Sequence, residues 1–166
     1  MVLGMSLATF TQVHVVISLI GIVSGLIVVF GMLSGKQLDG WTALFLVTTV
    51  LTNVTGFFFP FEHLKPSYIV ATISLLVLAI AIVARYPQNL AGGWRRTYVI
   101  TAVIALYFNV FVLVVQSFLK VPALHALAPE GKEPPFLVAQ LVVMAIFIGL
   151  GVGAVKKFSN SPVRTA

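Results

Sequence analysis

The chain contains no cysteine and few charged residues of either sign. None of its 166 residues is cysteine, and only 8% are Asp, Glu, Lys or Arg, with four acidic residues in all. Without cysteine, the chain has no disulfide, thiolate metal ligand or catalytic thiol. A soluble domain carries roughly a quarter charged residues. Ten basic and four acidic side chains are therefore too few to cover the surface of a soluble protein of this length.

What the chain has instead is apolar residues. They make up 60% of the sequence, and the mean hydropathy is +1.10. Such a composition excludes an intrinsically disordered protein, which needs low hydrophobicity and high charge. It also argues against nucleic acid as a partner, although the formal net charge is +6. The composition predicts a small integral membrane protein with the lipid bilayer around it.

Five long stretches contain no charged residue. They are residues 1–35, 40–61, 66–84, 97–119 and 134–155, and each has at least 19 residues. A helix rises about 1.5 Å per residue and needs about 20 apolar residues to cross a bilayer. The sequence therefore predicts a single all-α domain, 1–166, which is a bundle of five transmembrane helices. We expect these helices near residues 9–33, 41–60, 67–86, 96–119 and 135–156.

Proline positions support the expected helix limits. Pro66, Pro122 and Pro135 lie where a helix can begin without an amide hydrogen, and Pro60 falls in the last turn expected for the second helix. The longest loop, 120–134, is apolar enough to form a short interfacial helix after Pro122. We expect this loop to be a lid over the outer mouth of the bundle or a docking surface for a partner.

The basic residues predict the orientation of the chain. With five crossings, three basic residues fall on the side of the N-terminus, namely Lys65, Lys120 and Lys132. Seven fall on the other side, namely Lys36, Arg85, Arg95, Arg96, Lys156, Lys157 and Arg164. Short loops rich in Lys and Arg stay in the cytoplasm. The N-terminus is therefore expected outside the membrane and the C-terminus in the cytoplasm.

No charged residue is expected in the middle of any crossing. Proton pumps and many ion-coupled transporters need such residues, so these classes are disfavoured. The sequence also contains no motif for serine hydrolysis, phosphoryl transfer, zinc-dependent hydrolysis or dinucleotide binding. We therefore expect a membrane component without enzymatic activity rather than an enzyme.

Neutral polar residues gather toward the outer ends of the expected helices and are the functional candidates. The candidate ligand-binding residues are Gln12, His14, Asn53, Asn109, Gln116 and Gln140. Imidazole and amide groups can line an outward-facing pocket for a small molecule, such as a quinone-like or lipid-like compound. The alternative is that these groups hydrogen-bond between helices and hold the bundle together.

All three histidines, His14, His63 and His125, fall on the expected outer side. This placement raises a second possibility, a haem b or metal site built from these imidazoles. His63 follows Pro60 and is expected near the membrane interface, whereas His14 is expected about 8 Å below it. Two haem ligands normally lie at similar depths. His14 is the one histidine expected inside a crossing, so the haem hypothesis lacks a second ligand at its depth.

Small and aromatic residues have structural interpretations. Three Gly-x-x-x-Gly patterns permit close helix contacts, within the bundle, in a homo-oligomer or in a larger membrane complex. They are Gly21 with Gly25, Gly31 with Gly35, and Gly149 with Gly153. Four aromatic residues are expected to anchor the cytoplasmic ends of helices at the headgroups. They are Trp41, Tyr86, Trp94 and Tyr98.

Two segments carry a resemblance to known proteins. The stretch 55–60, TGFFFP, with Pro66-Ser67, and the stretch 105–116, ALYFNVFVLVVQ, before Lys120-Val-Pro122, resemble small bacterial inner-membrane proteins of unassigned activity. This resemblance implies a multi-pass protein of the bacterial inner membrane and no particular reaction. The first expected helix, with His14 followed by small residues, is also loosely similar to haem-binding four-helix membrane cytochromes.

Four functions therefore remain open from the sequence. The first is a membrane component with an outward-facing pocket for a small molecule, and the second is a haem b-binding redox protein. The third is a small transporter for neutral solutes, since missing charge does not exclude uncharged substrates. The fourth is a structural subunit of a larger membrane complex.

Overall fold

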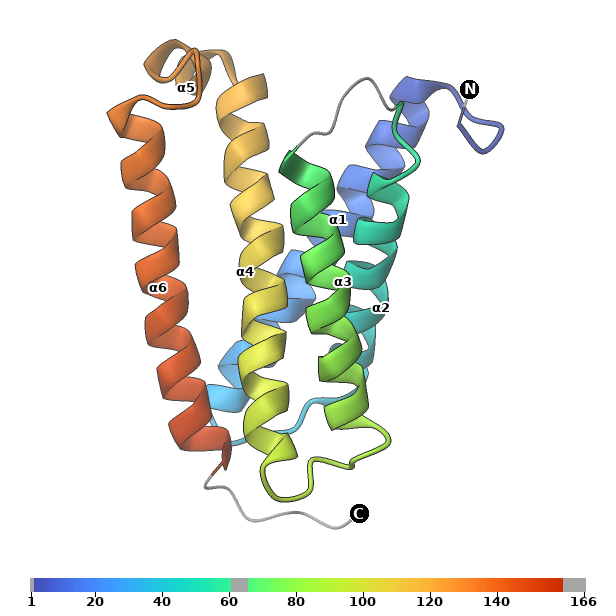
Figure 1. Ribbon diagram of the computed structural model, residues 1–166, viewed down its shortest axis with the longest axis vertical. Coiled ribbons are helices and arrows are strands. Elements are labelled where there is room, and N and C mark those ends of the chain that lie inside the picture. Colours follow the sequence, from blue (N-terminus) through green and yellow to red (C-terminus); the bar gives the residue numbers. More distant parts are fainter. Residues whose placement is uncertain (1, 61–65, 160–166) are drawn as a thin grey trace.

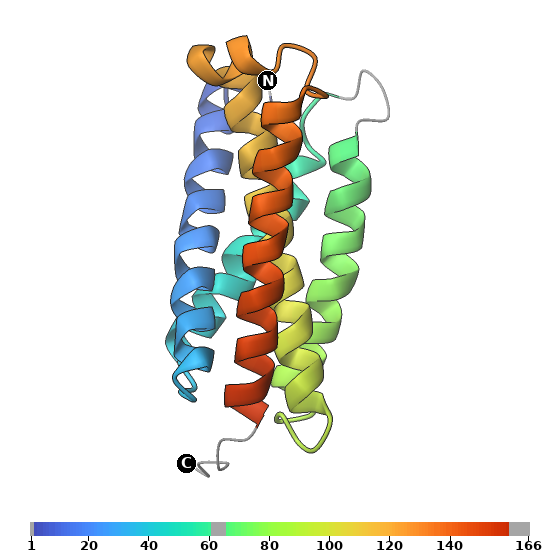
Figure 2. The ribbon, with the colours of Figure 1, turned by 90° about the vertical axis from the view of Figure 1, so that its left-hand side faces the viewer.

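The computed structural model describes residues 2–60 and 66–159, which form six helices and no strand. The helices are α1 (Leu7–Leu33), α2 (Asp39–Gly56), α3 (Pro66–Arg85), α4 (Trp94–Lys120), α5 (Pro122–Leu127) and α6 (Pro134–Ser159). The five long helices lie side by side with alternating direction, and α5 is at one end (Figures 1 and 2). We call the end that holds α5 and the start of α1 the outer end, and the opposite end the inner end.

Four of the helices are long and apolar enough to cross a membrane. They span Leu7–Leu33, Ser67–Arg85, Trp94–Lys120 and Pro134–Phe158. The all-helical fold is thus confirmed for the described residues, and membrane insertion is supported by these four helices. A fifth crossing and the orientation of the chain stay predictions.

Local sequence signals set both ends of α1. The Ser6 hydroxyl caps the N-terminus and accepts a hydrogen bond from the Thr9 amide at 3.1 Å. At the C-terminus, Gly35 has φ +66°, a conformation that glycine adopts without steric cost. Its amide bonds the Met32 carbonyl, and the Lys36 amide bonds the Gly31 carbonyl. This pair of bonds is a Schellman motif and turns the chain toward α2.

The end of α2 differs from the expected one. The helix ends at Gly56, four residues before the limit expected from the sequence. Phe57 and Phe58 donate to carbonyls three residues back, so the last turn is tightened. Pro60 has no amide hydrogen and disfavours helical geometry at the residue before it. It therefore lies beyond the helix and not in its last turn.

The central helix is α4, which contacts all five other helices. The best-buried core lies around the inner half of α4. Phe45 of α2 and the α4 residues Tyr98 and Leu106 are at most 1% exposed there. The expectation that Tyr98 anchors the headgroup region is wrong. Its hydroxyl donates to Thr42 at 3.4 Å, and the Arg85 guanidinium lies over its ring. Tyr98 faces α2 and α3 because it lies on the inward side of α4.

Two glycines of α1 allow close packing inside the bundle. A Cβ atom at Gly25 would lie 2.6 Å from a Leu106 methyl carbon and 2.8 Å from the Phe45 ring. A Cβ atom at Gly21 would lie 3.2 Å from the hydroxyls of Thr48 and Thr49. The first Gly-x-x-x-Gly pattern therefore serves contacts of α1 with α2 and α4.

Two arginines tie the inner ends of the helices together. Arg85, at the end of α3, forms an ion pair with Asp39 at the start of α2. Arg95, near the start of α4, donates to the Phe158 carbonyl at the end of α6 at 3.5 Å. The guanidinium of Arg95 also lies over the Phe158 ring. These contacts connect four helices at the level where basic residues gather.

Candidate binding site at the outer end of the bundle

The six candidate ligand-binding residues come from four helices. Gln12 and His14 lie on α1, Asn53 lies on α2, and Asn109 and Gln116 lie on α4. Gln140 lies on α6 and is buried against α4. These residues occupy two levels of the bundle. Asn53 and Asn109 belong to a buried layer near its middle, whereas His14 and Gln116 lie nearer the outer end.

The buried layer is built around Thr49 of α2. Asn109 donates to the Thr49 hydroxyl at 3.4 Å, and Asn53 donates to the Thr49 carbonyl at 2.8 Å. Asn53 also donates to the Ser74 hydroxyl of α3 at 3.1 Å. Thr49 is 0% exposed and Asn109 is 8% exposed. We call Thr49, Asn53, Ser74 and Asn109 the polar layer; it links α2, α3 and α4.

The polar layer is occupied by contacts within the protein. Each of its two amides has a hydrogen-bond donor engaged with a neighbouring helix or with its own helix. Groups in this state hold helices together and offer little to a ligand. Ser74 was not among the sequence candidates. The signal for it was a serine in the middle of a long apolar helix.

His14 has a defined set of neighbours. It is half-buried, and its Nδ1 lies 2.7 Å from the Thr55 hydroxyl of α2. The imidazole meets the Phe59 ring edge-on, with 5.1 Å between centroids. Phe59 in turn packs against Phe10, one turn before His14 on α1. The side chain is therefore held between α1 and the end of α2.

The hydrogen bonds of Thr55 fix the tautomer of His14. The Thr55 hydroxyl donates its proton to the Leu51 carbonyl at 2.7 Å. Its oxygen must then accept from His14, so the imidazole carries its proton on Nδ1. The Nε2 atom is left as an acceptor, and no residue in the described part of the chain bonds to it. Among the described residues, the Nε2 of His14 is therefore left open to a hydrogen-bond donor.

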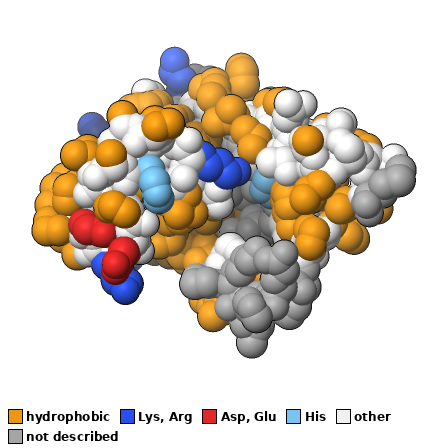
Figure 3. Space-filling model, turned by 90° about the horizontal axis from the view of Figure 1, so that it is seen from above, with side chains coloured by type: hydrophobic (Ala, Val, Ile, Leu, Met, Phe, Trp, Pro, Cys, Tyr) orange, Lys and Arg blue, Asp and Glu red, His pale blue; other side chains and the backbone are white. Residues whose placement is uncertain are grey.

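Other polar groups surround this level of the bundle. Gln116 is half-buried on α4, and Lys120 is one turn further along the same helix. The Lys120 ammonium is close enough to His14 to act on it electrostatically. Gln12 is exposed. It lies two residues before His14, and residues two apart on a helix point in nearly opposite directions. Seen from the outer end, the molecule is hollowed near its middle, with a histidine and a basic side chain beside the hollow (Figure 3).

Gln140 has one satisfied and one unsatisfied polar atom. Its Nε2 donates to the Phe111 carbonyl of α4 at 3.3 Å. Its Oε1 is buried and has no partner among the described residues. A buried acceptor without a partner costs stability unless a ligand or water supplies a donor.

The histidines do not form a metal cluster within residues 2–60 and 66–159. No group of three or more metal-ligating side chains is found there. His125 is exposed on α5. His63 lies outside the described residues, so the haem hypothesis stays a prediction.

The loop before α6 is fixed by a carboxylate. Glu133 accepts from the amides of Glu130 and Lys132, each at 2.9 Å. These hydrogen bonds, first the one from Glu130, hold the pKa of the exposed Glu133 carboxyl below its usual value. The short helix α5 and this turn together occupy the outer end between α4 and α6 (Figure 1).

Comparison with known proteins gives no assignment for this arrangement. The chain matches no family model, no curated protein and no solved structure.

Proposed function

We propose that this protein is a five-span component of the bacterial inner membrane, without enzymatic activity, that binds a small quinol-like molecule at its outer end. Its N-terminus lies outside and its C-terminus in the cytoplasm. The four long apolar helices support insertion in a membrane, and the bias of basic residues toward one side supports the orientation. The observation that carries the ligand proposal is the Nε2 of His14, to which no residue in the described part of the chain bonds.

The fifth span is α2. With 18 residues it is about 27 Å long, close to the thickness of the hydrocarbon core. Its hydropathy is lowered by Thr48, Thr49 and Asn53, which are all buried inside the bundle. The side chains it exposes include Leu44, Val47, Leu51 and Val54. The surface that α2 offers to lipid is therefore apolar.

The absence of cysteine provides a direct test of this span. Gln37→Cys places one thiol at an exposed position just before α2, and Phe58→Cys places one at an exposed position just after it. In intact cells, a membrane-impermeant maleimide should label Phe58→Cys and spare Gln37→Cys. Asn89→Cys and Lys132→Cys serve as inner and outer controls. Equal labelling of the first pair would place both ends of α2 on one side and contradict the five-span arrangement.

The chemistry of His14 favours a ligand that donates a hydrogen bond. Because Nδ1 is engaged with Thr55, Nε2 can accept a hydrogen bond from a hydroxyl group. A quinol carries two hydroxyls on an apolar ring, which suits a partly buried site lined by Phe59 and Phe10. Gln116 and Lys120 can donate to the second oxygen.

Two substitutions separate ligand binding from helix packing. Asparagine places an amide near the position of Nδ1, and glutamine places one near the position of Nε2. Binding of a short-chain quinol is measured by calorimetry under anaerobic conditions. His14→Asn should keep the contact with Thr55 and weaken binding about tenfold, the value of one hydrogen bond. His14→Gln should retain more of the affinity.

The exposed His125→Asn is the matched control and should bind like the original protein. If the original protein does not bind the quinol, the ligand proposal fails. If His14→Asn binds normally, His14 serves helix packing only.

A further inference from the structure

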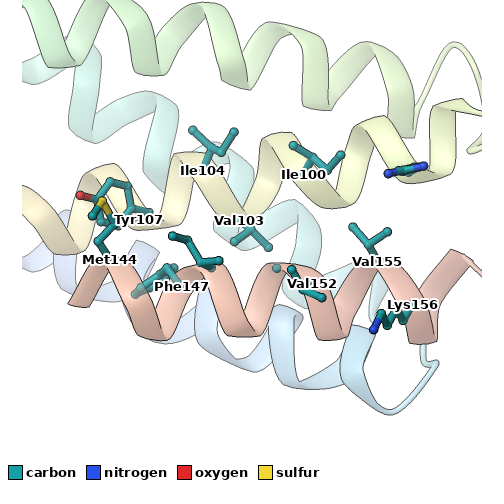
Figure 4. Close-up of a pocket in the computed structure, with 12 residues that line it drawn as sticks. Ile100, Val103, Ile104, Tyr107, Met144, Phe147, Val152, Val155 and Lys156 are labelled. Carbon is teal, nitrogen blue, oxygen red and sulfur yellow. The ribbon is translucent and has the colours of Figure 1, made fainter. Parts of the chain in front are cut away.

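A groove runs between α4 and α6 in the inner half of the bundle. Its volume is about 790 Å³, which is within the range of small-molecule sites. In Figure 4, side chains of the two helices line it from Tyr107 and Met144 at one end to Lys156 at the other. The groove shares no residue with the outer site around His14.

Small and buried residues leave the groove open. Gly151 lines it, and a Cβ atom there would already touch a Val103 methyl carbon at 3.4 Å, so a longer side chain at this position would take up space in the groove. Val103 and Phe147 are buried and lie at the back. Ile148 and Val152 line the groove and are at least 50% exposed. The groove therefore opens sideways, along the surface that faces lipid.

The inner end of the groove is cationic. Arg96 and Lys156 line it there, and neither makes an ion pair with another residue that the structure describes. Asp39, the described carboxylate at the inner end, is paired with Arg85. The groove thus presents two positive charges at one end and apolar side chains over the rest of its length.

The length of the groove matches half of a bilayer. Arg96 and Tyr107 are eleven residues apart on α4, about 16 Å along the helix. One leaflet contributes about 15 Å of hydrocarbon. With α4 and α6 crossing the membrane, the basic end lies at the headgroups and the other end near the bilayer centre.

We infer that the groove between α4 and α6 binds one anionic phospholipid of the cytoplasmic leaflet. The headgroup phosphate lies between Arg96 and Lys156, and an acyl chain fills the space above Gly151. A soluble anion would leave the apolar length empty, and a zwitterionic lipid would gain less from the two cations. The inference rests on the membrane insertion of α4 and α6 and on the orientation proposed above, and it is independent of the quinol site.

The test is native mass spectrometry of the detergent-purified full-length protein. It is titrated with phosphatidylglycerol and with phosphatidylcholine of identical acyl chains. We expect several-fold tighter binding of phosphatidylglycerol. In the double variant Arg96→Gln/Lys156→Gln this preference should disappear, with a loss of about thirtyfold in affinity for phosphatidylglycerol. Lys36→Gln removes an inner-end charge outside the groove and should change binding little; it is compared with Lys156→Gln.

A second pair of variants tests the acyl chain. Gly151→Leu fills the groove and should weaken binding of both lipids several-fold. Gly149→Leu adds the same side chain two residues away, where nothing lies within 4 Å of a Cβ atom, and should have little effect. Both proteins should give the same helical circular dichroism signal.

Four results would each overturn the inference. They are equal binding of the two lipids, no effect of the double charge variant, equal effects of the two glycine variants, and displacement of the lipid by inorganic phosphate. Recovery of a dimer with an empty groove would do so as well, because a second copy of the chain would then be the occupant.

Discussion

The two sides of the central helix α4 differ in how they are packed. Toward α1, α2 and α3, α4 joins a hydrogen-bonded polar layer, and Gly25 allows α1 to approach closely. Toward α6, it leaves an open groove. Only 11% of the most apolar stretch of α6 is buried, compared with 44% of that of α1.

This difference follows from the forces available in a bilayer. Lipid tails are as apolar as leucine, so burying apolar side chains gives little drive for two helices to associate. Close contacts at glycine and hydrogen bonds between helices supply it instead. The side of α4 that has both is tight, whereas α6 contributes mostly apolar side chains. Substitutions on the two sides should therefore have unequal effects.

The largest expected effect is that of Gly25→Ala on the tight side. The added methyl group would clash with Leu106 and Phe45, and overpacking of this kind costs about 1–3 kcal/mol. Gly149→Ala on α6 meets no atom within 4 Å and is the control. It should be neutral or slightly stabilising, because alanine favours helix. Unfolding by SDS in micelles, followed by circular dichroism, measures both. Equal losses would remove the contrast between the two sides.

The next largest effect concerns the polar layer. Asn53→Leu and Ser74→Ala each remove one partner of the bond between α2 and α3. A double-mutant cycle should give a coupling free energy of about 0.6–1.7 kcal/mol, as found for hydrogen bonds between membrane helices. A coupling of zero would mean that α2 and α3 are held by packing alone.

Replacing a polar residue of α6 by an apolar one should raise the free energy of unfolding instead of lowering it. Gln140→Met removes the buried Oε1, which has no partner among the described residues, along with one hydrogen bond to α4. Removing the buried acceptor should stabilise the protein slightly more than losing the hydrogen bond destabilises it. The free energy of unfolding should therefore rise by about 0.5–1 kcal/mol. A marked loss of stability in the same SDS titration would show that Gln140 holds α6 in place.

Asp39→Asn tests the ion pair at the inner end. The Asp39 side chain is largely exposed, so the pair with Arg85 should contribute only about 0–1 kcal/mol. The effect should shrink as salt is added. The same unfolding titration at low and high salt checks this expectation, and a salt-independent loss would point to a different cause.

The smallest expected effect is a pH dependence at Glu133. Its pKa is lowered in the folded protein, so its contribution is present above the ordinary glutamate pKa of about 4.3. That contribution is lost as the pH falls through the lower folded value. Amide exchange of Glu130 and Lys132 should then accelerate. Glu133→Gln should remove this pH response, and an unchanged response would assign it to another group.

Some features of the site were predictable and others were not. Charge-free stretches located the long helices, and the polarity of Asn53 and Asn109 marked residues that proved to be buried. Their partners were not predictable, because helix spacing does not tell which helices are neighbours. Gln12 and His14 were grouped by depth, yet the helix turns one outward and the other toward α2.

The sequence by itself determined that this protein is helical and apolar, because its long uncharged stretches are apolar without alternation, and a helix satisfies the backbone of such a stretch within itself. The tertiary structure decided which polar groups form hydrogen bonds within the protein. Thr49 bonds to both asparagines, and Thr55 bonds to one nitrogen of His14, while no residue that the structure describes bonds to the other. Hydrogen bonds need atoms within about 3.5 Å, and only the packing of helices brings distant residues that close.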